Sequence, residues 1–321
     1  MKNDLTFRPW QEGDDLELLQ IWPDAESTSA ATFRASFAPD SDESPWRRTL
    51  VAEHKGVAIA AATVYETSLH AEHLWAYVEV APDHRRGGIG TELLERLRRL
   101  AQDSPSGVVS LRSKVDVESD AVEFALAQGF KKIQRTRVVR IEAGAVPGVP
   151  LHQNEEGEMT QAIEDIATGS VELTQKVWDF YQRSHQWDPP AQTSLGRVNR
   201  LFLSDEAEAF GALVLRDDVL SARANGKKGD IKAFAVSYRP LEHDMPGFEV
   251  EDDAATEVLL GYDFDYPQAR EAILQMLSPL AAQYPVTVEV TESMEDLSIL
   301  IDQLIKMGAA SVVENSFVVV D

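Results

Sequence analysis

Short apolar runs and alternating apolar and polar positions recur through residues 1–142, and they predict a regular series of strands and helices. Strands are expected at residues 5–10, 49–53, 57–65, 74–80, 108–115 and 133–142. Helices are expected at residues 14–22, 29–37, 89–101 and 119–128. In the third of these helices, one stripe collects the apolar side chains Ile89, Leu93, Leu94, Leu97 and Leu100. The order indicates an α/β (α+β) fold with a central mixed β-sheet flanked by helices.

Proline and glycine residues interrupt this pattern at residues 144–150, and a polar stretch follows them. We therefore expect a linker at residues 146–157. It would separate a first domain, residues 1–145, from a second domain, residues 158–321. A chain of 321 residues is long enough for two ordinary domains.

The second domain resembles a diverged repeat of the first. Gly129 aligns with Gly308 at an offset of 179 residues, and hydrophobic positions after each glycine keep the same register. Pro82, however, aligns with Pro267 at an offset of 185. The six-residue difference falls on residues 85–90, which are rich in glycine in the first copy and have no counterpart in the second. The alternative is an unrelated α+β domain whose register matches by chance.

The segment Arg-Arg-Gly-Gly-Ile-Gly at residues 85–90 lies between a predicted strand and a predicted helix. Glycines let the backbone approach a phosphate closely, and the free amides and dipole at the helix start favour an anion. Arg85 and Arg86 add positive charge. The spacing matches neither a phosphate-binding P-loop nor a Rossmann fingerprint. The segment therefore predicts a pyrophosphate ligand of another kind.

The pattern Val80-Ala81-Pro82 followed by Arg85-x-x-Gly88-x-Gly90 resembles the acetyl-CoA loop of the GNAT N-acetyltransferase superfamily. Residues 120–130, which close with Gly-Phe, resemble the second motif of that family. Two positions depart from the pattern, because Glu118 stands where the family often has Asn and Ala125 where it has Tyr. That Tyr is the family's usual proton donor to the departing CoA thiolate. The resemblance implies two tandem GNAT-like domains, of which the second has lost the pyrophosphate loop.

The resemblance also implies acetyl-CoA as co-substrate and identifies the residues that would hold it. Backbone amides of the strand before the loop bind the thioester and pantetheine in the family, and the loop binds the pyrophosphate. The corresponding residues here are Val78, Glu79, Val80, Arg85, Arg86, Gly87, Gly88, Ile89, Gly90 and Thr91.

Strand alternation predicts that Trp75, Tyr77 and Glu79 share one face of the strand at 74–80. A carboxylate beside two aromatic side chains is a candidate general base that removes a proton from the attacking amine. Tyr77 is a candidate proton donor to the thiolate in place of the Tyr missing at Ala125. The alternatives are a paired structural carboxylate or a solvent-facing one at Glu79, and ordinary packing at Tyr77.

Two histidines, His70 and His73, precede this strand at a spacing that metal ligands can have, but no clear third ligand accompanies them. We therefore expect no metal. A histidine here could instead contact the substrate or serve as an alternative base. The chain contains no cysteine, which excludes a cysteine acyl-enzyme and indicates direct transfer of the acetyl group.

The formal net charge is −24, and it is unevenly distributed. Residues 1–150 hold 18 basic and 23 acidic side chains, whereas residues 151–321 hold 12 and 31. This balance argues against nucleic acid as a partner. The acidic half either keeps the chain soluble or attracts a cationic amine. No apolar run reaches membrane-spanning length and no signal core begins the chain, so we expect a cytoplasmic protein.

Together these features predict an acyltransferase in which the first domain moves an acetyl group from acetyl-CoA directly to the primary amine of a small molecule. Two alternatives stay open. One is a non-catalytic acyl-CoA-binding or regulatory protein, which Ala125 favours. The other is a protein-lysine acetyltransferase.

Overall fold

The computed structural model describes residues 4–24, 28–239 and 255–321, and it divides the chain into two compact units. Unit 1 comprises Met1–Ile133, Asp188–Ala191 and Ser316–Asp321, and unit 2 comprises Gln134–Trp187 and Gln192–Asn315. The predicted domain ranges follow the repeat in the sequence, whereas these units follow the packing of the chain.

Unit 1 is built on a mixed sheet with the strand order β1-β2-β3-β4-β5-β12. Its strands are β1 (Leu5–Pro9), β2 (Arg47–His54), β3 (Val57–Tyr65), β4 (Leu74–Val80), β5 (Leu111–Asp116) and the end of β12 (Ala310–Val320). Its helices are α1 (Asp14–Leu19), α2 (Thr28–Ala35), α3 (Ile89–Leu100) and α4 (Asp120–Ala127). All neighbouring strands are antiparallel except β4 and β5, which are parallel. One predicted strand began too early, because Val109 is exposed and β5 starts at Leu111.

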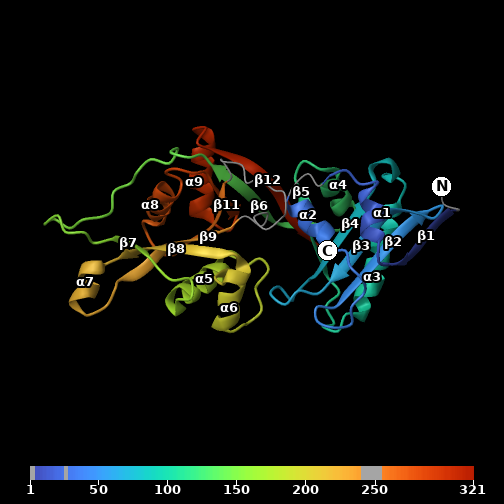
Figure 1. The fold of residues 1–321 in the computed structure, drawn as a ribbon, viewed down its shortest axis with the longest axis horizontal. Helices are drawn as coiled ribbons and strands as arrows, with labels where there is room; N and C mark the ends of the chain where they lie inside the picture. Colours follow the sequence, from blue (N-terminus) through green and yellow to red (C-terminus); the bar gives the residue numbers. More distant parts are fainter. Residues whose placement is uncertain (1–3, 25–27, 240–254) are drawn as a thin grey trace. The chain divides into compact units, whose positions relative to one another are not determined.

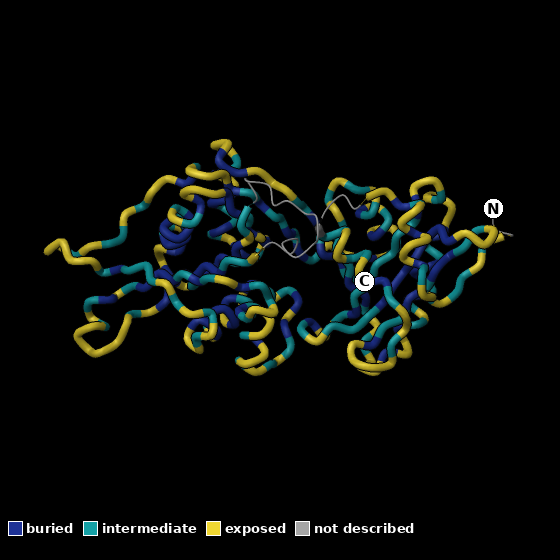
Figure 2. The backbone as a smooth tube through the Cα atoms, viewed as in Figure 1, coloured by how far each residue is buried: buried dark blue, intermediate teal, exposed yellow. Residues whose placement is uncertain are grey.

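The core of unit 1 lies on both faces of this sheet. Leu93 and Leu97 of α3 are fully buried against one face, which confirms the predicted stripe. Leu18 of α1 is fully buried on the other face with Trp22 and Phe37. Burying one such leucine contributes about 1.5–3 kcal/mol. Figure 2 shows that buried positions concentrate on the strands and the inner faces of the helices.

Unit 2 repeats this plan with the strand order β6-β11-β10-β9-β8-β7. Its strands are β6 (Lys131–Ile141), β7 (Ala162–Asp165), β8 (Ala209–Asp217), β9 (Asp230–Tyr238), β10 (Thr256–Tyr262) and β11 (Val286–Thr291). Its helices are α5 (Val171–Ser184), α6 (Leu195–Phe202), α7 (Val219–Ala224), α8 (Ala269–Leu280) and α9 (Glu295–Lys306). Figure 1 shows α5 and α6 on one side of β8 and β9, with α8 and α9 on the other. Only the pair β10–β11 is parallel, as β4–β5 is in unit 1.

The two halves of the sequence exchange their last strands. Strand β6 ends the first half, yet from Gln134 onward it belongs to unit 2 and pairs with β11. Strand β12 ends the second half, yet from Ser316 onward it belongs to unit 1 and pairs with β5. Each unit therefore takes five strands from one half of the sequence and most of its sixth strand's pairing from the other half, and the matching strand order supports the repeat seen in the sequence.

Two further properties concern the parts of the chain that the structure describes. None of their helices is both long and apolar enough to cross a membrane. Their histidine, aspartate and glutamate side chains form no group of three or more that could hold a metal ion.

Candidate functional site

The glycine loop of unit 1 connects the end of β4 to the start of α3 and leaves the helix without a side-chain cap. Gly88 is the N-cap residue, with φ 83°. Because glycine has no side chain, no side-chain hydrogen bond caps the first amides of the helix. The first intrahelical bond runs from Glu92 N to Gly88 O, so the amides of residues 88–91 have no acceptor within the helix. A Cβ atom at Gly90 would make only an ordinary van der Waals contact, of 3.5 Å, with the ring of Phe124. The local sequence therefore builds an anion site of backbone amides.

Arg85 and Arg86 lie in this loop and are exposed. The Arg85 Nε donates to the carbonyl of Val80 at 3.1 Å. Arg86 forms an ion pair of 2.7 Å with Asp120, and both side chains are about three-quarters exposed. Such an exposed pair contributes only about 0–1 kcal/mol, so a pyrophosphate could displace it at little cost.

Beside the loop, strands β4 and β5 part after a short parallel contact. Their pairing consists of Leu74 with Leu111 and Trp75 with Arg112. Strand β4 continues to Val80 while still paired with β3 on its other side. Its second edge is therefore open beyond Trp75, and a pantetheine chain could add to that edge as a strand would.

The direction of the backbone amides corrects one predicted contact. The amide of Leu74 points toward β5, since it donates to Ser110 O, whereas the amide of Ala81 points toward β3 and donates to Ile59 O. Amides alternate along a strand, so those of Val78 and Val80 face the open edge. The amide of Glu79 points toward β3 instead, and its predicted contact with the thioester is not available to it.

The side chain of Glu79 lies on the opposite side of the sheet from α3 and is held by two partners. Arg34 of α2 forms an ion pair with it, with a shortest N–O distance of 2.6 Å, and the Tyr77 hydroxyl donates to it at 2.8 Å. The carboxylate is about one-tenth exposed. The sequence placed Glu79 beside Tyr77 correctly but contained no signal for Arg34, which belongs to a helix 45 residues away. These two contacts fix the orientation of the Glu79 carboxylate.

Tyr77 is a poor acid in this setting. Burial, followed by the charge of Glu79 and the hydrogen bond to it, raises the pKa of Tyr77 well above its usual range. An ordinary thiol has a pKa near 8.5 and an ordinary phenol near 10, so protonation of a thiolate by this phenol is already uphill. Tyr77 as the proton donor stays a prediction, and its raised pKa counts against it. Ala125, at the position of the family's usual Tyr, is buried in the core and supplies no proton.

A buried ionic cluster adjoins the point where β4 and β5 part. Arg112 forms an ion pair with Asp188, whose side chain is fully buried, and its guanidinium lies 4.0 Å from the ring centre of Trp75. His70 and His73 also approach Asp188. Burial and the charge of Arg112 lower the pKa of His70 to about 4 and also lower that of His73, so both rings are neutral at pH 7.

The corresponding region of unit 2 lacks the anion site. Strands β10 and β11 pair at three positions and then part, as β4 and β5 do. Helix α8, however, begins at Ala269 after the N-cap residue Gln268, and no glycine precedes it in the connection from Tyr262. Asp263 and Asp265 stand in that connection, and Arg85 and Arg86 of the first copy have no counterpart in it.

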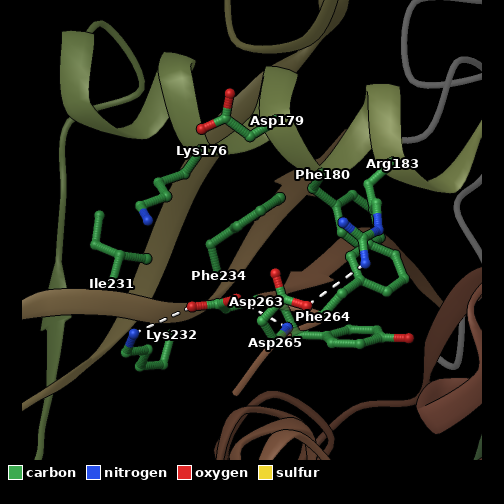
Figure 3. A pocket seen from close by; sticks show the side chains of 11 residues that line it. Lys176, Asp179, Phe180, Arg183, Ile231, Lys232, Phe234, Asp263, Phe264 and Asp265 are labelled. Atoms are coloured by element: carbon green, nitrogen blue, oxygen red, sulfur yellow. Dashed lines mark hydrogen bonds and ion pairs between the residues drawn. The ribbon is translucent and has the colours of Figure 1, made fainter.

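Unit 2 has a pocket of about 230 Å³, but its lining does not resemble a phosphate site (Figure 3). It is lined by Lys176, Asp179, Phe180, Arg183, Ile231, Lys232, Phe234, Tyr262, Asp263, Phe264 and Asp265. Lys232 pairs with Asp263 at 3.1 Å and Arg183 with Asp265 at 3.5 Å, as the dashed lines in Figure 3 mark. These ion pairs neutralise charge that a phosphate would need in this pocket.

Comparisons with known proteins bear on unit 1 and on the architecture of the whole chain. Residues 9–130, which contain the glycine loop and the second motif, match the model of the acetyltransferase (GNAT) family. Over these 122 of its 321 residues, all of them in unit 1, the chain is similar to the GNAT acetyltransferase family. That family uses acetyl-CoA, and the matched range ends at Phe130, before β6 begins.

The tandem architecture of this chain also matches solved structures over nearly its whole length. A GCN5-related N-acetyltransferase from Sphaerobacter thermophilus aligns with a TM-score of 0.63 at 13% identity, covering 100% of this chain and 96% of that one. A tandem GNAT protein from the clavulanic acid biosynthesis pathway aligns with a TM-score of 0.58 at 15% identity, covering 99% and 98%. A putative acetyltransferase from Pyrococcus horikoshii aligns with a TM-score of 0.53 at 16% identity, covering 100% and 90%. These likenesses show the fold alone. Among curated protein sequences, none matches this chain.

Proposed function

We propose that unit 1 transfers the acetyl group of acetyl-CoA directly to the primary amine of a small molecule. The observation that carries this proposal is the uncapped glycine loop at the end of a strand whose neighbour has parted from it. The loop amides and the two arginines would hold the pyrophosphate, and the amides of Val78 and Val80 would hold the pantetheine and polarise the thioester carbonyl.

Acetyl transfer requires that the attacking amine lose a proton. Glu79 is the carboxylate on the face of β4 away from α3, and its Oε2 already accepts a hydrogen bond from Tyr77. We propose that Glu79 attracts the ammonium form of the acceptor and takes its proton, directly or through one water. Arg34 holds the carboxylate in a fixed orientation through their ion pair. Transfer is direct, because the chain has no cysteine that could carry the acetyl group.

The test is turnover of acetyl-CoA with a panel of primary amines, such as L-lysine, spermidine, putrescine, glucosamine and tyramine, measured as release of free CoA thiol. A second candidate function is non-catalytic binding of acyl-CoA, which Ala125 and the raised pKa of Tyr77 favour. Tight binding of acetyl-CoA without turnover of any amine would support that second function instead.

We expect one acetyl-CoA to bind per chain. Unit 2 retains the parted strands but has no glycine loop, and two aspartates occupy the connection before its helix. Calorimetric titration of the whole chain with acetyl-CoA should therefore give a stoichiometry near one. A stoichiometry near two would show that the second copy still binds the cofactor.

We also expect the Michaelis constant for the acceptor to rise with added salt, while turnover at saturation changes less. The second half of the sequence carries 31 acidic against 12 basic side chains, and attraction between exposed charges is screened over about 8 Å at physiological ionic strength. Charge reversal at the exposed residues Glu155, Glu156 and Glu158 should raise the same constant. If these reversals leave it unchanged, the acidic half does not attract the substrate.

A further inference from the structure

The segment Asp188–Ala191 comes from the second half of the sequence but belongs to unit 1. It is attached to the connection between β3 and β4 at two backbone positions. The amide of Ala191 donates to Leu69 O at 2.7 Å, and the carbonyl of Asp188 accepts a hydrogen bond of 2.8 Å from His70 Nδ1. The second half of the chain therefore supplies an arm to the unit that carries the glycine loop.

The arm brings a fully buried carboxylate into unit 1. An ionised carboxylate in the interior is costly unless it is paired, and Asp188 is paired with the guanidinium of Arg112, which is itself buried. His73 Nδ1 lies 3.3 Å from the same carboxylate. Since both histidines are neutral at pH 7, Arg112 is the cation that balances Asp188.

Arg112, the partner of Asp188, lies where β4 and β5 part, beside the proposed site. Arg112 stacks on Trp75, and these two residues form the last pair before β4 and β5 part. The indole of Trp75 then contacts Phe33 of α2, with ring centres 5.5 Å apart. Phe33 in turn stacks on Tyr77 at 5.1 Å, and Tyr77 donates to Glu79. A continuous series of contacts thus joins the buried carboxylate to the proposed base.

We propose that Asp188 is a positioning residue for the acceptor amine. Asp188 holds Arg112 against Trp75 and thereby fixes the positions of the aromatic side chains on one face of β4. The acceptor would approach Glu79 over this face. A residue from the second half of the sequence would therefore help to form the acceptor site of unit 1. This inference rests on the proposed function, because it assumes that the acceptor binds on that face. The cofactor side is separate, since α3 and the glycine loop contact none of these groups through the interactions described above.

The experiment compares three variants with the natural chain. Asp188→Asn removes the buried charge and keeps the shape. Because it leaves the guanidinium of Arg112 without its anion, it is paired with the double variant Asp188→Asn/Arg112→Gln, which removes both charges. The matched control is Glu172→Gln in unit 2, which weakens the ion pair of another buried arginine, Arg216. For each variant, kcat and KM are measured with the best amine of the panel, and acetyl-CoA affinity is measured by calorimetry.

We expect both Asp188 variants to lower kcat/KM for the amine by about 10- to 100-fold, mainly through KM, because small misplacements of a binding surface have effects of that size. Acetyl-CoA affinity should stay within about twofold, since its site is made by the loop, and the control should match the natural chain. An unchanged acceptor KM in either folded Asp188 variant would overturn the proposal. An equal loss of acetyl-CoA affinity would also overturn it, because the effect would then be a general loss of structure.

A second measurement does not depend on turnover. Hydrogen exchange should become faster in residues 66–77 of both Asp188 variants and stay unchanged in α3. Unchanged exchange in residues 66–77 would contradict the positioning role even if no amine were acetylated. Failure of the natural chain to acetylate any amine would refute the proposed function, and the exchange result would still decide whether Asp188 orders this face.

Discussion

Replacing Gly88 with glutamate is expected to weaken acetyl-CoA binding by at least about 100-fold, which corresponds to about 2.7 kcal/mol. Gly88 has φ 83° and caps α3 without a side chain. A glutamate there strains the backbone and places a carboxylate beside the amides that would receive the pyrophosphate. Calorimetry with acetyl-CoA measures the loss, and circular dichroism checks that the chain is folded.

The matched control for this variant is Gly157→Glu. Gly157 also has a positive φ, of 81°, and a Cβ atom added at either glycine would meet no other part of the protein within 4 Å. It lies in a turn of unit 2, so the control reproduces the backbone strain and the added charge without touching the loop. Equal loss of acetyl-CoA affinity in both variants, or in neither, would remove the glycine loop from the proposed site.

Replacing Glu79 with glutamine should lower turnover by about 10²–10⁴-fold, the usual contribution of a general base. Glutamine keeps the shape of the side chain but has no basicity and no charge to attract an ammonium group. Acetyl-CoA affinity should be nearly unchanged, because the carboxylate lies on the face of β4 that Tyr77 and Arg34 share. Stopped assays of CoA release at saturating acetyl-CoA give the turnover directly.

Because Glu79 is also a structural partner of Arg34, the same substitution should cost about 1.5–3 kcal/mol of unfolding free energy, the usual value for a hydrogen bond to a charged group. Glu53→Gln is the control. Glu53 lies on β2, which does not neighbour β4, and it forms an ion pair of 2.6 Å with Arg8 of β1. It should lower stability to a similar degree and leave turnover intact. Natural turnover in a folded Glu79→Gln variant would mean that the carboxylate only anchors Arg34 and that water delivers the amine already neutral.

Much of unit 1 could be predicted from short stretches of sequence, because short-range rules govern it. The stripe on α3 follows from the helical period, and Leu93 and Leu97 are buried as that period requires. The glycine loop is recognisable because backbone approach and free helix amides depend on a few adjacent residues. The position of β4 and the shared face of Tyr77 and Glu79 follow from the period of two in a strand.

The partners of these residues could not be predicted, since they come from distant parts of the chain. Arg34 meets Glu79 across 45 residues, and Asp188 meets His70 across 118 residues. No local pattern specifies such pairs, because they are selected by which helix or arm packs over which face of the sheet. The same holds for the exchange of β6 and β12 between the two units.

The sequence by itself therefore indicated the resemblance to the GNAT family, the order of the elements, the glycine loop at residues 85–90 and the absence of such a loop from the second copy. Only the tertiary structure decided where β4 and β5 part, which amides face the opening, and which charges surround the proposed base. The physical reason is range. Periodicity and backbone geometry act over a few residues, whereas the environment of a carboxylate depends on every segment that packs against it.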